Sequence, residues 1–248
     1  MKIHSAFLAL ALCCIAGTAA VHARQDAGVD AKATRALSQI GEKLRSLRQY
    51  TVTAALQTRA PLASGQYKEF SGTANYQVRT PDHLRAQVRG VGFDRDIYYD
   101  GRTITVFSPE KNTYARIDAP GTLSTLVAQV EQRTGFTMPI AQLFSWDDQA
   151  RLLQGAERAS YSGEALVGGR KCAHYSYKKA GIAWEVFADA QHLPCKLAFV
   201  DTRDPGLPGY SGELKWSEGA TLPDSTFVFT PPAGAREVAW DQFHAGGK

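Results

Sequence analysis

Apolar residues recur along this chain with two different periods, and each period predicts a different element. Over residues 30–48 they recur at helical spacing, which predicts an amphipathic helix with one apolar face. From Tyr50 to Leu56 every second residue is apolar, which is typical of a half-buried strand. We therefore expect one helix followed by a β-rich region.

Turn signals separate the alternating runs at the short intervals that antiparallel neighbours require. The period of two returns over residues 70–79 and 84–89. Asp100 and Gly101 lie between two β-type runs, and this dipeptide favours a tight hairpin turn. Parallel pairing would need longer crossovers than this region offers. An antiparallel meander of about six strands is predicted to end at Ile117.

The helical period returns between residues 120 and 155. Thr122 is expected to cap a helix that ends at Gly135, and Pro139 suits the first turn of a short helix. Asp147 is expected to cap a third. The middle of the chain is therefore predicted to be a helical insertion inside a β-protein.

Strands are predicted again from about residue 159, with Gly168 and Gly169 at a hairpin turn and a last short strand beginning at residues 227–229. The expected fold class is mainly β with helices (α+β): one strongly curved antiparallel sheet of about ten or eleven strands. The N-terminal helix and the central insertion are the covers available for its apolar face. Because they carry too little apolar surface to fill a wide barrel, we expect a cavity between helices and sheet.

The first 23 residues have the features of a cleavable signal peptide. Lys2 supplies positive charge, residues 6–20 form an apolar run, and small residues follow. Cleavage after Ala20 is an alternative to cleavage after Ala23. A membrane anchor is disfavoured because the run is shorter than the roughly 20 apolar residues that span a bilayer. We expect a signal peptide over 1–23, a single domain over 24–235 and a polar tail over 236–248.

Composition changes this picture little. The chain has 248 residues, a net charge of +4 and 44% hydrophobic residues, which is ordinary for a globular protein. It contains no long run of like charges, so binding to nucleic acid is not predicted. No later segment is apolar enough to predict a membrane span.

Two cysteines remain after the predicted signal peptide, Cys172 and Cys195. Two cysteines in an exported protein favour one disulfide. The alternative is a metal site, because His174 and His192 lie close to them in sequence, and Cys172 and His174 would share one face of a strand. This spacing matches no standard zinc finger, and the compartment oxidises thiols. We therefore favour the disulfide and expect neither a metal nor a cofactor.

The residues that could carry catalysis form no recognisable arrangement. His83, His174 and His192 have no partner at a spacing typical of a catalytic site, and His83, after a turn, is expected to be exposed. Two acidic pairs, at positions 94 and 96 and at 147 and 148, could do acid and base chemistry. The first falls on the polar face of a predicted strand and the second at a helix cap. We expect no catalytic residue and no enzymatic activity.

Apolar side chains of the predicted inner face are the remaining candidates for a binding role. At strand spacing they are core residues first, and the alternative is an apolar pocket that takes an acyl chain or similar ligand. The candidates for its lining are Val52, Ala54, Leu56, Phe70, Tyr76, Val78, Leu84, Val88, Leu126, Val130, Trp184 and Trp216.

Five short motifs follow one another along the chain: RTPDHLR at 79–85, YDGRT at 99–103, YA at 114–115, LPCKL at 193–197 and FVFTPPAGA at 227–235. Together they resemble a family of predicted periplasmic proteins of unknown function, domain of unknown function 2092. The strand-rich carboxyl end is also similar to the broader lipoprotein-carrier (LolA-like) superfamily, to which an anti-sigma-factor regulator that senses envelope stress is similar. The resemblance implies a half-open antiparallel barrel closed by helices over a hydrophobic cavity, a periplasmic location and no catalytic residues.

Two functional hypotheses follow. The first is a non-catalytic periplasmic binding protein that holds a lipid, a lipoprotein acyl chain or another hydrophobic ligand between sheet and helices. The alternative is a protein-interaction or envelope-stress regulatory module that docks a membrane partner. The expected partners are thus a hydrophobic ligand or an envelope protein.

Overall fold

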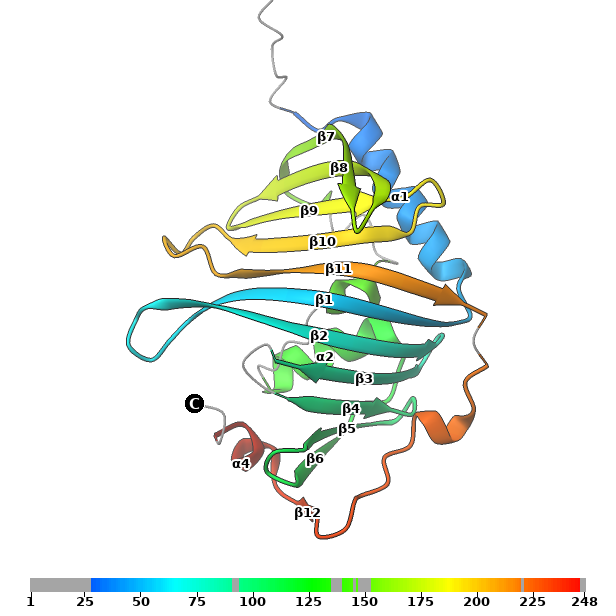
Figure 1. The fold of residues 1–248 in the computed structure, drawn as a ribbon, viewed down its shortest axis with the longest axis vertical. Helices are drawn as coiled ribbons and strands as arrows, with labels where there is room; N and C mark the ends of the chain where they lie inside the picture. The colour runs from blue at the N-terminus through cyan, green and yellow to red at the C-terminus, as the bar shows by residue number, and fades with distance from the viewer. Residues whose placement is uncertain are drawn as a thin grey trace, which may run out of the picture.

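The protein is built on a single twelve-stranded sheet, shown in the computed structural model of Figure 1. The structure describes residues 28–90, 94–134, 140–144, 146, 153–219 and 221–245. The predicted signal peptide and the cap expected at Asp147 lie outside these residues. The strands are β1 (Gln49–Pro61), β2 (Tyr67–Arg79), β3 (His83–Arg89), β4 (Arg95–Tyr99), β5 (Thr103–Ser108), β6 (Thr113–Asp118), β7 (Ala156–Val167), β8 (Arg170–Lys179), β9 (Ile182–Ala188), β10 (Pro194–Asp201), β11 (Gly209–Glu218) and β12 (Arg236–Glu237). The helices are α1 (Ala31–Ser46), α2 (Leu123–Thr134) and α4 (Trp240–Ala245), with 3₁₀ helices η1 (Ala141–Phe144) and η2 (Asp224–Thr226).

Two antiparallel meanders make up the sheet. β1 to β6 run in sequence order towards one edge, β7 to β11 run in sequence order from the other, and the pairing of β1 with β11 joins them. The predicted turn between β4 and β5 is present: the Asp100 carboxylate accepts hydrogen bonds from the backbone N–H groups of Arg102 and Thr103 at 3.0 and 2.8 Å. Gly101 has a φ of 90°, which glycine adopts readily. Because β7 and β12 form opposite edges, the curved sheet is unclosed over the described residues.

Helix α1 forms where the apolar period predicts it. The Asp30 side chain caps its start by accepting a hydrogen bond from the backbone N–H of Lys32 at 2.7 Å. Its buried face includes Leu37 and Ile40. The hydroxyl of Tyr177, on β8, donates to the carbonyl of Ala33 at 2.9 Å and ties the helix to the sheet.

One apolar core joins the sheet to α1 and α2. Val52, Tyr76 and Leu84 of the strands are completely buried, and Leu37 of α1 and Leu126 of α2 belong to the same cluster. In Figure 1 both helices lie behind the sheet. Residues of β1 that alternate with the buried ones are exposed or half-buried. The period of two in the sequence thus corresponds to one apolar face.

The segment after β11 differs from the prediction. Residues 227–229, expected to begin a strand, are not a strand: they follow η2 and run across the outer face of the sheet. The ring of Phe229 packs against Tyr98, Phe107 and Tyr114, with centroids 5.3, 5.5 and 5.0 Å away. Phe229 in this apolar run therefore packs against aromatic rings and does not pair with a neighbouring strand.

The edge of the sheet at β6 is also different from the prediction, which allowed only antiparallel pairs. β12 pairs with β6 in parallel. The long return after β11 supplies the crossover that parallel pairing requires. Residues 236–245 of the expected polar tail thus contain β12 and α4, and Phe243 of α4 is buried in the core.

Candidate functional site

The end of α1, the start of β1, the β2–β3 turn, α2 and η1 border a cavity of about 330 Å³, which we call the helix cavity. This volume falls at the lower end of the roughly 300–1,000 Å³ typical of small-molecule sites. Trp146 adds to its wall. The lining residues are Gly41, Leu44, Arg45, Arg48, Tyr50, Thr80, Pro81, Thr122, Leu123, Ser124, Leu143, Phe144 and Trp146.

The turn between β2 and β3 holds the two helix ends together at the cavity. The Thr80 backbone N–H donates to the carbonyl of Arg48 at 2.9 Å, and its hydroxyl donates to the carbonyl of Leu47 at 3.0 Å. The carbonyl of Pro81 accepts from the backbone N–H of Leu123, the first residue of α2, at 2.8 Å. One short turn therefore positions the residue that follows α1 and the residue that begins α2.

Aromatic rings form the inner wall. Tyr50 is 3% exposed and lies 5.5 Å from Trp216, and Phe144 lies 5.7 Å from Tyr76, measured between ring centroids. Burial raises the pKa of the Tyr50 phenol well above its usual value of 10. The wall is therefore apolar and uncharged at any physiological pH.

The mouth of the helix cavity is cationic. Among the described residues that line it, Arg45 and Arg48 are the charged ones, both are exposed, and none is a carboxylate. Two hydroxyl groups line the same cavity: Thr122 and Ser124 are in hydrogen-bond contact with each other at 3.0 Å. The site thus combines an apolar wall with positive charge and hydrogen-bonding groups at its entrance.

A second cavity, of about 410 Å³, lies at the other end of β1, between the β1–β2 and β10–β11 hairpins; we call it the hairpin cavity. Phe199 and Tyr210 stack on its wall with centroids 5.3 Å apart. Its arginine, Arg59, donates through Nε to the carbonyl of Gly206 at 2.8 Å and lies 3.5 Å from the carboxylate of Glu69. The charge in this second cavity is therefore already paired.

The twelve side chains predicted to line a pocket lie elsewhere in the structure. None of them lines the helix cavity or the hairpin cavity. Phe70 and Trp216 are half-buried, and Trp216 and Tyr76 stand one layer behind the helix cavity, in contact with its aromatic wall. Their role in binding stays a prediction. The buried members are Val52, Ala54, Leu56, Tyr76, Val78, Leu84, Val88, Leu126, Val130 and Trp184.

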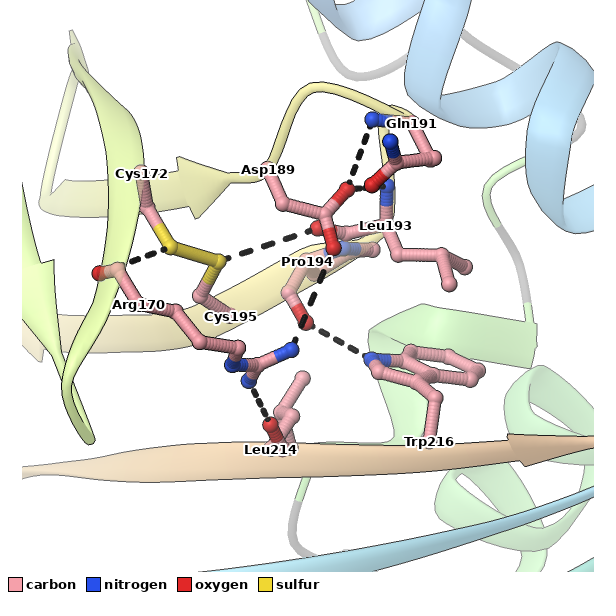
Figure 2. Close-up of a disulfide and its surroundings, with 9 residues drawn as sticks. All are labelled: Arg170, Cys172, Asp189, Gln191, Leu193, Pro194, Cys195, Leu214 and Trp216. Atoms are coloured by element: carbon pink, nitrogen blue, oxygen red, sulfur yellow. Dashed lines mark hydrogen bonds and ion pairs between the residues drawn. A yellow bond between two sulfur atoms is a disulfide. The ribbon is translucent and has the colours of Figure 1, made fainter.

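The predicted disulfide between Cys172 of β8 and Cys195 of β10 is confirmed, and Figure 2 shows its surroundings. The two strands are separated by β9, which ends at Ala188. The register of β10 shifts beside Cys195, and the disulfide joins the two Cα atoms across 6.6 Å at this end of β9. Both thiols are thus used, and the alternative metal site built on them is wrong.

Polar groups around the disulfide are extensively paired, and we call the region of Arg170, Cys172, Asp189, Pro194 and Cys195 the disulfide corner. The guanidinium of Arg170 donates to a carbonyl of β11 and lies 3.9 Å from the Asp189 carboxylate. That carboxylate also accepts two backbone N–H groups of the β9–β10 turn at 3.0 Å each. The Pro194 carbonyl accepts from the indole of Trp216 at 2.7 Å (Figure 2).

Structural partners occupy several of the side chains that could have carried catalysis, whereas Asp147 and Asp148 lie outside the described residues. His83 is half-buried and not exposed as expected, because the C-terminal segment brings Phe227 within 5.2 Å of its ring. His174 stacks on a neighbouring phenylalanine ring at 4.0 Å. Asp96 forms an ion pair with Arg89 on the sheet. Among the described residues, no group of three or more histidine, cysteine or acidic side chains could hold a metal ion.

Sequence reasoning missed the residues that do line the helix cavity. They come from separate segments of the chain, so no spacing along the sequence connects them. Arg45 and Arg48 read as basic residues at a helix end, where positive charge is common. The signal present in the sequence was the motif at 79–85, which contains Thr80 and Pro81.

The structure defines a mainly β protein with few helices: one curved, unclosed and almost wholly antiparallel sheet with a cavity beside its helices. The chain belongs to the family described as predicted periplasmic protein (DUF2092), whose model matches residues 33–240. The family expected from the motifs is confirmed, and the periplasmic location with it. A comparison with curated proteins finds no match. Over the part of the chain that the structure describes, no helix has both the length and the hydropathy to cross a membrane.

Three of the solved structures to which this chain is similar come from different bacteria. Lipoprotein LppX of Mycobacterium tuberculosis has a TM-score of 0.49 and 12% identity, over 78% of this chain and 100% of that one. The MucA/MucB complex of Pseudomonas aeruginosa gives 0.45 and 15%, over 80% and 62%. A LolA superfamily protein of Nitrosomonas europaea gives 0.35 and 14%, over 79% and 97%.

Proposed function

We propose that this periplasmic protein is a non-catalytic binding protein that holds the hydrocarbon part of a lipid, a lipoprotein acyl chain or another hydrophobic ligand in the helix cavity. The observation that carries the proposal is the cavity of about 330 Å³ beside the buried rings of Tyr50, Phe144 and Trp146. In the proposal, α1 and the central helical insertion cover the apolar face of a half-open barrel.

Hydrophobic burial supplies the affinity in this proposal. Each methylene group that leaves water for an apolar wall contributes about 0.8 kcal/mol, before the costs of association are subtracted. The predicted residues Tyr76 and Trp216 stand directly behind the rings of Phe144 and Tyr50. We propose that the twelve predicted residues form the deeper path into which a longer chain extends when those rings turn aside.

The proposal contains no chemical step. Tyr50, with its raised pKa, stays protonated at physiological pH, and the hydroxyl groups of Thr122 and Ser124 contact each other. General base catalysis needs a group such as histidine or a carboxylate within hydrogen-bond reach. None is among the described residues of the cavity lining.

A cavity-filling substitution tests the site. Ser124→Trp places a ring at the cavity, where Ser124 is half-buried. We expect it to weaken binding of N-phenyl-1-naphthylamine, a neutral probe that fluoresces in apolar sites, by about tenfold or more. The matched control is Ser217→Trp, because Ser217 is exposed on β11 and lines neither cavity. Circular dichroism of both variants checks that they fold.

Two results would count against the proposal: a wild-type protein that does not bind the probe, and two tryptophan variants that bind it equally well. The native ligand is sought by purifying the protein from a bacterial periplasm without detergent. Mass spectrometry of the extract is then expected to find one apolar ligand class in stoichiometric amount.

One observation favours the alternative function, docking of an envelope protein. Leu62 and Leu207 are 39% and 50% exposed at neighbouring ends of the β1–β2 and β10–β11 hairpins, which project together from the sheet (Figure 1). Exposed apolar side chains of this kind occur at interaction sites. If the native protein carries no lipid and crosslinks from positions 62 and 207 to one envelope protein, this second function replaces the first.

A further inference from the structure

We infer that the ligand of the helix cavity is an amphiphile with an anionic head group, a carboxylate or a phosphate, which Arg45 and Arg48 bind at the cavity mouth. This inference rests on the proposed function and adds the chemical class of the ligand. The hydrocarbon part lies against the aromatic wall, and the charged part stays at the entrance where the arginines are exposed.

The charge at the mouth is uncompensated among the described residues. Ion pairs of other arginines are well formed, as in Arg79 with Asp224 at 2.6 Å and Arg203 with Asp201 at 2.6 Å. Arg45 and Arg48 form none with any described carboxylate, and the described lining contains no acidic side chain. Two arginines that line one cavity repel each other, and an anion between them relieves that repulsion.

The backbone that carries Arg48 is fixed in place. The carbonyl of Arg48 accepts a hydrogen bond from the backbone N–H of Thr80, and the carbonyl of Leu47 accepts one from the Thr80 hydroxyl. The next residue, Gln49, accepts the backbone N–H of Leu222 at 2.8 Å through its side chain. A guanidinium on a fixed backbone loses less freedom on binding a carboxylate or phosphate, with which it forms charge-assisted hydrogen bonds.

Hydroxyl groups complete the entrance. Thr122 and Ser124 line the same cavity as the arginines, and their mutual hydrogen bond uses only one of their two hydroxyl hydrogens. Hydroxyl groups donate hydrogen bonds to anionic oxygens as readily as they accept from other groups. An entrance with two guanidinium groups and one hydroxyl hydrogen left by the Thr122–Ser124 contact, and no described carboxylate, therefore selects an anion over a neutral or cationic head group.

The hairpin cavity shows that this arrangement is particular to one end of the sheet. Its Arg59 is paired with Glu69, which also lines that cavity, at 3.5 Å. An anionic ligand there would have to displace a carboxylate. The helix cavity requires no such exchange among its described residues, so the anionic ligand is assigned to it.

Displacement of N-phenyl-1-naphthylamine by matched twelve-carbon amphiphiles tests the inference. Dodecanoate and dodecyl phosphate are compared with dodecanol on the wild-type protein. We expect at least one of the two anions to displace the probe at about tenfold lower concentration than dodecanol. Added salt should reduce this ratio because it screens exposed charges. Whichever anion gives the larger ratio identifies the head group.

Arginine variants supply the decisive comparison. R45Q/R48Q should bring the anion-to-alcohol ratio close to one, whereas R35Q should keep it, because Arg35 is exposed on the same helix but lines neither cavity. A wild-type ratio near one, or a tenfold ratio that persists in R45Q/R48Q, overturns the inference. Either result is distinct from failure of the proposed function, in which the wild-type protein would not bind the probe at all.

Discussion

The helix cavity and the disulfide corner are built in opposite ways on the same sheet. In the disulfide corner, the two thiols form a disulfide and Arg170 lies close to the Asp189 carboxylate. That carboxylate also accepts two backbone N–H groups of the β9–β10 turn. At the helix cavity, apolar side chains from separate segments border open volume, and two arginines face solvent. The disulfide corner is thus held by specific bonds, whereas the helix cavity leaves volume unfilled.

Open volume carries a cost, because the atoms that line it lack contacts on one side. The protein therefore needs stability from regions that do not bind ligand. The disulfide corner lies on β8, β10 and the β9–β10 turn, whereas the helix cavity is lined by residues of other elements. We interpret the two regions as separate sources of stability and of binding, and each prediction below tests that separation.

Loss of the disulfide should have the largest effect on stability. C172S/C195S removes a crosslink between residues 23 positions apart. The chain-entropy model gives a loss of about 3 kcal/mol in the free energy of unfolding for a loop of this length. Urea denaturation measures it. Because neither cysteine touches the helix cavity, the variant should still bind N-phenyl-1-naphthylamine as the wild-type protein does.

Reduction of the wild-type protein serves as the control for this variant. Dithiothreitol should lower wild-type stability by a similar amount and leave C172S/C195S unchanged. If the double variant folds but no longer binds the probe, the two regions are not independent, and the comparison fails.

Leu143→Ala, unlike loss of the disulfide, should change ligand binding clearly and stability only moderately. Leu143 is 4% exposed in η1 and lines the helix cavity. We expect a loss of about 2 kcal/mol, the low end for such a truncation, because the side chain already borders open volume. The enlarged cavity should favour hexadecanoate over dodecanoate in probe displacement. Leu166→Ala, at a side chain 76% exposed on β7, should change neither quantity.

The sequence was sufficient for features that depend on local periodicity. The period of two located the strands, and turn residues such as Asp100 and Gly101 located the hairpins, because both effects act over a few residues. Phe229 shows the limit. The apolar run Phe227–Phe229 resembles a strand, but the partners of Phe229, Tyr98 and Tyr114, lie more than a hundred residues away. Only the folded chain shows that they meet.

The candidate site was harder to predict than the fold for a similar reason. Inward-facing residues such as Val52 and Leu84 are found by their period, but a period does not separate a packed core from a cavity wall. The position of the cavity depends on how α2 and η1 pack against the end of α1. Arg48 and Thr80, which meet there through a backbone hydrogen bond, give no joint signal in the sequence.

Trp216→Phe should have a smaller effect on stability. Trp216 connects the disulfide corner to the helix cavity. Its indole donates to the carbonyl of Pro194 in the disulfide corner, and its ring packs on Tyr50 of the cavity wall. Phenylalanine keeps a ring but removes the donor, which should cost about 1 kcal/mol of unfolding free energy. In the C172S/C195S background the cost should differ, since neighbouring interactions are coupled. A cost that is the same in both backgrounds would show that the bond and the disulfide act independently.

The smallest expected effect lies at the far end of β10, which begins in the disulfide corner and ends beside the hairpin cavity. Hydrogen bonds from Arg203 lower the pKa of Asp201 from 3.8 to about 2. A carboxyl group whose pKa is lowered by folding stabilises the folded protein at pH values above its ordinary pKa. That contribution is lost as the pH falls from about 4 to about 2.

Carbon-13 NMR titration of the Asp201 carboxyl should therefore give a midpoint near pH 2, and R203Q should return it towards 3.8. At neutral pH the melting temperature should change little, because exposed ion pairs contribute little to stability. A wild-type midpoint near 3.8 would contradict the pairing itself. If R203Q instead destabilised the protein as much as loss of the disulfide, then β10 would be held as firmly at its open end as at its crosslinked one. The disulfide corner would then not be the main source of stability along this strand.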